Sequence, residues 1–183
     1  MMCSDPKHAP KQLPEHAPEH APSDVARPQP VERDFQMRIT ADGSWYHEGG
    51  LIKRIALVKL FASVLDVDAQ GQHWLRTPVE YGRIEVEDAP FIITALASTG
   101  QAQARHVSLT DNLDREHDLG PDTPLIFRSA AEQADNRPYL RLAGGLLARL
   151  SRPVWYELAG LADDEDEAGR PGLWSAGCFF PLS

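Results

Sequence analysis

A seven-residue motif occurs twice in this chain and constrains its fold more than any other feature. Residues 49–55 read GGLIKRI and residues 144–150 read GGLLARL, with four identical positions and no gap. Each copy follows a strand-like segment with an aromatic residue and precedes an acidic loop, a glycine and a strand with a tryptophan. This shared order favours an internal duplication. It predicts two related α+β lobes, at residues 33–90 and 91–183.

The first 32 residues differ in composition from these lobes. Residues 1–32 hold seven of the fifteen prolines and three of the seven histidines, with a Pro-Glu-His-Ala repeat at 14–21. Prolines at this density remove backbone donors, and the few apolar side chains cannot offset the entropy of ordering. We expect a disordered Pro/His-rich tail. Its histidines could bind a metal ion weakly, or the tail is a solvated linker.

Composition excludes several classes of protein for the remaining chain. No stretch approaches the roughly 20 apolar residues of a membrane-spanning helix, and no apolar signal-peptide core is visible near the start. Two cysteines cannot form a disulfide framework. The formal net charge of -9 argues against non-specific coating of nucleic acid. We therefore expect a cytoplasmic protein, and the sequence leaves its oligomeric state open.

Each repeated motif is expected to open a helix. The first helix is predicted at 51–65, and its few polar residues do not share one face, so we expect it to be covered on more than one side. The second is predicted at 146–152, where Pro153 would stop it. In each lobe a helix that starts at a Gly-Gly pair should pack on a small, mostly antiparallel sheet.

Alternation of apolar and polar residues predicts the strands. Residues 35–39 and 83–87 alternate cleanly, with Ile84 turned inward. Residues 154–158 and 173–180 are expected to form the closing strand pair of the second lobe.

The start of the first predicted helix is a candidate anion site. Gly49 and Gly50 would leave backbone N–H groups open, and Lys53 and Arg54 would place two cations in the first turn. Cations are unfavourable at a helix N-terminus unless an anion offsets them. A bound ligand could supply that anion, or an internal carboxylate such as Glu48 could.

Glu85 and Glu87 form the second candidate cluster, together with Asp88. Glu85 and Glu87 share one face of a predicted strand, where they could hold a divalent cation or supply acid–base chemistry. Alternatively this face is solvated or pairs with Arg76 and Arg83.

Other chemistries lack their motifs. A zinc helix beginning at His47 would need a second histidine where Leu51 stands, so we expect no metal site and no cofactor. Ser175 lies outside a nucleophile elbow, and Cys178 lies in an apolar strand typical of a core thiol. Trp45 and Tyr46 could stack on a flat ligand, although aromatic residues spaced along strands usually belong to the core.

Motifs in both lobes resemble those of a known family. In the first lobe they are DGSWYHEGG at 42–50, IKR at 52–54, LFASVL at 60–65, TPVE at 77–80 and GRIEVEDAPF at 82–91. In the second lobe they are PYL at 138–140, GGL at 144–146 and WSAG at 174–177. Over residues 34–182 the chain resembles the proteobacterial family catalogued as domain of unknown function 1285 (DUF1285).

This resemblance implies a duplicated two-lobe α+β fold whose second lobe is loosely similar to a pleckstrin-homology domain. It also implies a ligand site between the lobes, for a nucleotide-like molecule, and a role in signalling. We therefore expect a non-catalytic regulatory protein that binds a small anionic ligand. The candidate binding residues are Trp45, Tyr46, His47, Lys53, Arg54, Arg76, Arg83, Glu85 and Glu87.

Two alternatives stay open. The chain could be a protein-interaction module without a small ligand. It could also be an enzyme that uses His47 with Glu85 or Glu87 as acid and base.

Overall fold

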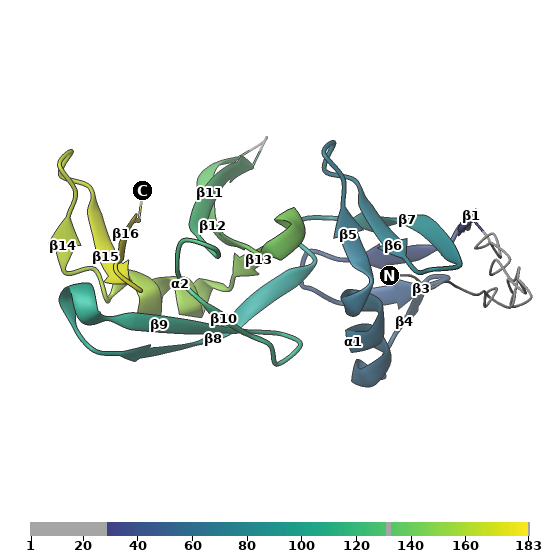
Figure 1. The fold of residues 1–183 in the computed structure, drawn as a ribbon, viewed down its shortest axis with the longest axis horizontal. Helices are drawn as coiled ribbons and strands as arrows, with labels where there is room; N and C mark the ends of the chain where they lie inside the picture. Colours follow the sequence, from purple (N-terminus) through teal and green to yellow (C-terminus); the bar gives the residue numbers. More distant parts are fainter. Residues whose placement is uncertain (1–28, 131–132, 183) are drawn as a thin grey trace, which may run out of the picture.

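The computed structural model describes residues 29–130 and 133–182 of the chain. It shows a mixed α+β protein with two lobes side by side along its long axis (Figure 1). The N-terminal lobe contains one helix and the C-terminal lobe another, and sheets make up most of the rest. This confirms the predicted α+β class and the two-domain organisation.

The first lobe is built on one seven-stranded sheet in the order β4-β3-β2-β7-β6-β5, with β1 also beside β7. Its strands are β1 (Val31–Glu32), β2 (Met37–Ile39), β3 (Trp45–His47), β4 (Gly50–Leu51), β5 (Leu65–Val67), β6 (His73–Arg76) and β7 (Glu80–Val86). Strands β1 and β2 run parallel to β7, and the other pairs are antiparallel. Ile84 on β7 is buried as the alternation predicts.

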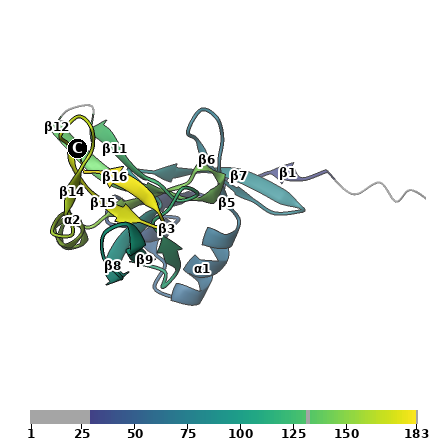
Figure 2. The same cartoon turned by 60° about the vertical axis from the view of Figure 1, so that its left-hand side comes forward.

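Helix α1 (Ile55–Ser63) covers one face of this sheet. It starts four residues later than the sequence predicts for its glycine pair, because Gly50 and Leu51 form the edge strand β4. Only Val58 and Ala62 of the helix are buried, and they lie four residues apart on one side. Leu57 and Leu60 on the opposite side are exposed, and Figure 2 shows α1 on the outside of the molecule. The expectation that the helix is covered on two sides is therefore wrong.

The second lobe contains a six-stranded sheet in the order β10-β9-β8-β13-β12-β11 and a three-stranded sheet in the order β14-β15-β16. The strands of the larger sheet are β8 (Phe91–Thr99), β9 (His106–Asp111), β10 (Glu116–Asp118), β11 (Leu125–Ala130), β12 (Gln133–Arg141) and β13 (Leu147–Leu150). The smaller sheet contains β14 (Asp164–Glu165), β15 (Pro171–Ser175) and β16 (Cys178–Pro181). The short helices η1 (Ala102–Ala104) and η2 (Ala143–Gly145) lie in connections.

Helix α2 (Arg152–Ala159) follows β13 and buries Val154 and Leu158 in the core of this lobe. The sequence predicted a helix at 146–152 and a strand at 154–158, and both predictions are wrong. Pro153 lies in the first turn of α2. Backbone N–H groups in this turn have no acceptor within the helix, so a proline is tolerated there, and Pro153 lies at the start of a helix and not at its end. The preceding residues form β13 instead, with Ala148 and Leu150 buried in alternation.

The two large sheets share a strand order. In each sheet three consecutive strands and the next three are arranged as 3-2-1-6-5-4, and the central pair, β2–β7 or β8–β13, is parallel. The two Gly-Gly motifs do not occupy equivalent places in this arrangement. Gly49 and Gly50 lead into β4, whereas Gly144 and Gly145 belong to η2 and precede β13. Neither pair starts a helix.

Most of the predicted tail, residues 1–28, lies outside the described residues, and so does its histidine repeat. Val31 and Glu32, which we assigned to the tail, form β1, and the Val31 N–H donates a 3.0 Å hydrogen bond to the Val79 carbonyl. In the described part of the chain no helix has the length and apolar character needed to cross a membrane.

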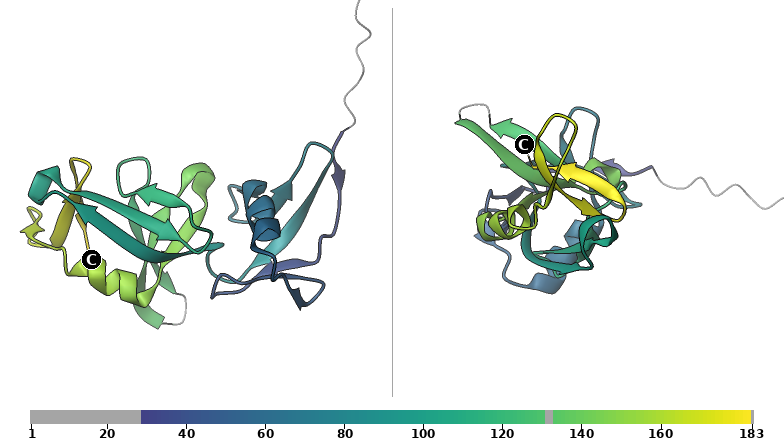
Figure 3. Two further views of the ribbon diagram at one scale, coloured as in Figure 1. Left: turned by 90° about the horizontal axis from the view of Figure 1, so that it is seen from below. Right: turned by 90° about the vertical axis from the view of Figure 1, so that its left-hand side faces the viewer.

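Polar contacts fix the lobes against each other. The Lys59 ammonium of α1 lies 2.9 Å from Asp114, which follows β9, and the Asn112 amide donates to the Gly43 carbonyl at 3.3 Å. The Arg149 guanidinium on β13 donates to the Ala41 carbonyl at 2.8 Å. The view from below shows the two lobes side by side (Figure 3).

Candidate functional site

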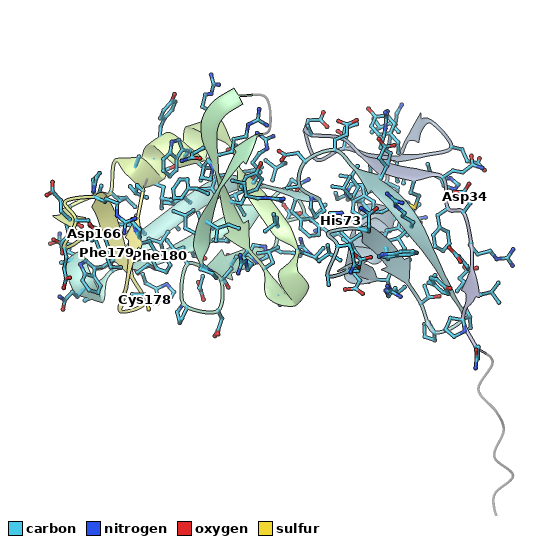
Figure 4. All side chains as sticks on the ribbon, turned by 90° about the horizontal axis from the view of Figure 1, so that it is seen from above. Asp34, His73, Asp166, Cys178, Phe179 and Phe180 are labelled. Carbon is cyan, nitrogen blue, oxygen red and sulfur yellow. The ribbon has the colours of Figure 1, made fainter. Side chains whose placement is uncertain are left out.

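A cleft of about 700 Å³ lies between the two lobes. On the first lobe its wall is the β5–β6 hairpin, including Val67, Asp68 and His73, and Figure 4 shows His73 on the side of that lobe nearest the second. Asp88, in the segment that joins the lobes, also lines the cleft. The opposite wall belongs to strands β11, β12 and β13 and to the η2 glycines.

Strand pairing gathers arginines on the sheet face to which this wall belongs. Arg128 of β11 pairs with Arg137 of β12, and Tyr139 of β12 pairs with Arg149 of β13. Side chains two residues apart on a strand share a face, so Arg141 joins them. One face of three adjacent strands therefore carries four guanidinium groups.

Asp88 neutralises part of this charge. Its carboxylate lies 2.9 Å from Arg149 Nε and 3.9 Å from an Arg137 guanidinium nitrogen. It also accepts a 2.6 Å hydrogen bond from the Tyr139 hydroxyl. Burial, followed by this hydrogen bond to an anion, raises the pKa of Tyr139 to about 12. The neutral phenol therefore remains a donor to Asp88.

Arg128 and Arg141 also line the cleft, but neither side chain has a hydrogen bond or ion pair with any described residue. Both side chains are exposed. Beside them lie Gly144 and Gly145, each at positive φ, where a glycine avoids the strain of a side chain. An added Cβ on Gly144 would meet nothing within 4 Å, so the backbone is open at this rim.

The first lobe contributes one carboxylate and one imidazole to the opposite wall. The Trp74 indole and the backbone N–H of Gln72 each donate to Asp68 at 2.8 Å, and these bonds hold the pKa of Asp68 below its usual value. Burial lowers the pKa of His73, with Asp68 acting against that effect. Asp88 is compensated by Arg149 and Arg137, so with His73 neutral the charges of Arg128 and Arg141 exceed the remaining charge of Asp68, and this part of the cleft is cationic.

None of the binding residues expected from the sequence lines this cleft. Four of them, Tyr46, Arg76, Arg83 and Glu85, lie on the outer face of the first sheet, opposite α1. Arg76 pairs there with Asp66 at 2.9 Å and stacks on the Trp74 and Tyr81 rings.

The remaining expected residues are dispersed. Trp45 is 2% exposed in the core, so it cannot form a stacking wall for a ligand. Lys53 and Arg54 are exposed just before α1, with Arg54 as its N-cap, and not within its first turn. Glu87 accepts a 2.9 Å hydrogen bond from the Ala41 N–H and lies 3.6 Å from Arg38.

His47 and Glu85 lie on opposite faces of the first sheet. His47 pairs with Met37, which is buried beneath α1, whereas Glu85 pairs with the exposed Arg38. No hydrogen bond joins His47 to either glutamate in the described structure. The geometry therefore gives no support to an acid–base pair of these residues.

The sequence did contain a signal for the arginine wall. Arg137, Tyr139 and Arg141 alternate with Pro138 and Leu140, which predicts a strand with a polar, cationic face. Spacing along the chain does not reveal which carboxylate these arginines contact.

Other candidate chemistry is sparse. Across residues 29–130 and 133–182 no three His, Cys, Asp or Glu side chains gather closely enough to hold a metal ion. Cys178 is half-buried on β16 and is not paired in a disulfide. The side chain of Asp111 is fully buried, contacts Arg115 and His117, and holds the turn that contacts the first lobe.

Fold and cleft together define a class: a two-lobe α+β protein with a cationic cleft between its lobes. The chain belongs to the DUF1285 family. The domain of unknown function described as the DUF1285 N-terminal domain matches residues 21–89, and the DUF1285 C-terminal domain matches residues 90–182. No curated protein matches the sequence.

Two crystal structures of DUF1285 family proteins are similar to this one. That from Silicibacter pomeroyi DSS-3 is 34% identical with a TM-score of 0.76, over 88% of this chain and 87% of that chain. That from Shewanella baltica OS155 is 25% identical with a TM-score of 0.55, over 69% of this chain and 92% of that chain.

Proposed function

We propose that this protein binds a small anionic ligand in the cleft between its lobes and acts in regulation. The observation that carries this proposal is the pair Arg128 and Arg141, two guanidinium groups without a partner among the described residues, on a cleft of about 700 Å³. Guanidinium groups bind carboxylates and phosphates through paired hydrogen bonds. The cleft volume is in the range of small-molecule sites.

A nucleotide-like ligand suits this arrangement. Strand spacing of about 3.3 Å per residue separates Arg141 from the Arg128–Arg137 pair by roughly 13 Å, so an elongated ligand with more than one anionic group could reach both. Because the walls come from different lobes, a ligand that contacts both would favour one arrangement of the lobes. That population shift is the proposed regulatory signal.

Calorimetric titration of the full chain with nucleoside diphosphates, nucleoside triphosphates, inorganic phosphate and aliphatic dicarboxylates tests the proposal. We expect at least one anion to bind, and the variants Arg128→Gln and Arg141→Gln each to weaken it about tenfold or more. Arg83→Gln, an exposed arginine on the outer face of the first sheet, is the matched control and should bind normally. No binding by any anion, or equal loss in the control, contradicts the proposal.

A protein-interaction role is the second candidate, and the exposed side of α1 favours it. Ile55, Leu57 and Leu60 are 51%, 37% and 60% exposed, and Leu51 beside them is 48% exposed. Exposed apolar patches commonly mark interaction sites. Lys53 and Arg54 flank this patch, so an acidic partner protein is favoured. A pull-down tests this role. A partner protein that binds the wild type and Arg128→Gln equally, but does not bind Leu60→Asp, would support it.

The common strand order of the two large sheets supports an origin by duplication, although the Gly-Gly motifs are not equivalent within it. The likeness of the second lobe to a pleckstrin-homology domain and a cytoplasmic location remain predictions.

A further inference from the structure

A second cavity, of about 400 Å³, lies on the other side of the Asp88–Arg149 ion pair. This cavity and the cleft share no lining residue. Its wall includes Arg137, Arg149, Arg152, Trp155 and Tyr156, and Ala41 closes it from the first lobe. We propose that this cavity is a separate site for a small aromatic anion, a planar ring that carries a carboxylate or a phosphate. The inference goes beyond the cleft ligand and does not depend on it.

The charge of the cavity supports an anion. Three arginines line it, and none of its described lining residues is acidic. Arg149 is held in place, with Nε 2.9 Å from Asp88 and a terminal nitrogen donating to the Ala41 carbonyl at 2.8 Å. The Asp88 carboxylate that contacts Arg149 is also shared with Arg137 and Tyr139.

Arg152 is the least compensated of these charges. Its side chain makes no hydrogen bond or ion pair with the described residues and is exposed. It occupies the first position of α2, where the partial positive charge of the helix N-terminus makes a cation unfavourable. A bound anion would relieve both unfavourable features, because it would contact the guanidinium group and the end of the helix together.

The aromatic half of the site comes from the same helix. Arg152, Trp155 and Tyr156 are three and four residues apart, a spacing that places them on one side of α2. Trp155 is fixed from behind by Phe127, whose ring meets it edge-on at 5.7 Å and 79°. Tyr156 is 65% exposed, so its ring is accessible to a ligand.

This combination selects the ligand class. An aliphatic anion would use the arginines but would leave the rings exposed, and a neutral aromatic would leave the arginines uncompensated. A planar ring against Trp155 or Tyr156, with its anionic group toward Arg152 and Arg149, satisfies both. The volume suits a ligand of one or two rings and is too small for an extended chain.

The test titrates the full chain with 1-naphthyl phosphate, 1-naphthoate, cyclohexyl phosphate and 1-naphthol, followed by tryptophan fluorescence and calorimetry. One or both aromatic anions should bind, and the phosphate and carboxylate arms identify the preferred group. Cyclohexyl phosphate and naphthol should bind about tenfold more weakly or not at all. Arg152→Gln and Tyr156→Ser should each weaken the aromatic anion about tenfold, whereas the exposed control Arg54→Gln should not.

The aromatic half of the site is tested at Tyr156 and not at Trp155, because Tyr156 is exposed and its replacement should not prevent folding. Equal binding of cyclohexyl and naphthyl phosphate, no binding by any probe, or unchanged binding in Arg152→Gln overturns the proposal. The double variant Arg128→Gln with Arg141→Gln separates the two sites. If it abolishes naphthyl phosphate binding while Arg152→Gln does not, the ligand occupies the cleft, and only the second-site proposal fails.

Discussion

The Tyr139 hydroxyl donates a 2.6 Å hydrogen bond to Asp88 Oδ1, and so joins strand β12 of the second lobe to the segment that leaves the first. Tyr139 is buried, and the Arg149 guanidinium lies on the same carboxylate at 2.9 Å. This contact lies between the two candidate ligand sites, so its strength bears on the stability of the lobes and on their arrangement.

Replacement of Tyr139 by phenylalanine should lower the free energy of unfolding by about 2 kcal/mol, because a buried hydrogen bond to a charged acceptor is lost. Urea denaturation at neutral pH measures the change. Tyr156→Phe, on an exposed ring whose hydroxyl makes no hydrogen bond with the described residues, is the control and should leave stability unchanged. A Tyr139→Phe variant as stable as the wild type would contradict this account.

The same bond predicts an alkaline loss of stability. The pKa of Tyr139 is raised from 10.0 to about 12 in the fold, so its contribution is complete below pH 10.0 and is lost as the pH rises toward 12. Tyr139→Phe should lack this component. Absorbance titration of tyrosinate in the wild type should show an ionisation step near pH 12, and that step should vanish in the variant.

The lowered pKa of Asp111 predicts that the folded protein loses stability in acid. Burial alone would raise its pKa, but bonds from His117, Arg115 and the backbone outweigh burial and hold the pKa at about 2. The charged form is therefore favoured in the fold. This stabilisation is present above pH 3.8, the ordinary value, and is lost as the pH falls toward 2.

Asp111→Asn should lower the free energy of unfolding at neutral pH by about 2 kcal/mol, because the buried carboxylate loses its charge-assisted hydrogen bonds to the partly exposed Arg115 and to His117. It should also flatten the acid dependence. Thermal denaturation between pH 7 and pH 3 measures both effects. Asp118→Asn, on a side chain that is 67% exposed, should change neither, and a comparable loss there would indicate a general charge effect.

His73 predicts a pH dependence of ligand binding in the cleft. Burial lowers its pKa from 6.5, so the imidazole is neutral at pH 7 and becomes a cation only in more acidic solution. An anion in the cleft should then bind about fivefold more tightly, as for a partly exposed ion pair worth roughly 1 kcal/mol. Calorimetry with a disulfonate, whose own charge is constant, should show this gain in the wild type and lose it in His73→Gln. A gain that persists in the variant rules out His73 as its source.

Gly82 on β7 lies where the surrounding atoms leave no room for a side chain. A Cβ there would collide with the Arg33 carbonyl oxygen and would lie 2.6 Å from a Phe35 ring carbon. Gly82→Ala should therefore lower the free energy of unfolding by about 1–3 kcal/mol through overpacking. Gly50→Ala, where the added Cβ would meet only the His47 carbonyl at 3.5 Å, is the matched control for urea denaturation. Equal stability of both variants would show that the segment at Arg33 and Phe35 moves freely aside.

Local patterns predicted the elements best where one face of a segment is buried and the other is not. The alternation around Ile84 predicted a strand at 83–87, within three residues of the ends of β7, and the apolar run before Ser63 predicted a helix at 51–65, longer at both ends than α1. The run from Leu147 to Leu150 failed, because four residues of mixed apolar and polar character satisfy both a helical and a strand period. Pro153 was misjudged for the related reason that its effect depends on its position within a helix.

The sequence by itself determined the family, the α+β class and the presence of two lobes, because these follow from long motifs and from the period of apolar residues. Only the tertiary structure decided which charges are compensated. Asp88 contacts Tyr139 and Arg149, which lie far along the chain, while Arg128 on a neighbouring strand has no partner among the described residues. Trp45 could equally have been a surface ring until the sheet buried it. Ion pairs and burial depend on distances of a few ångströms between distant segments, and spacing along one chain does not specify those distances.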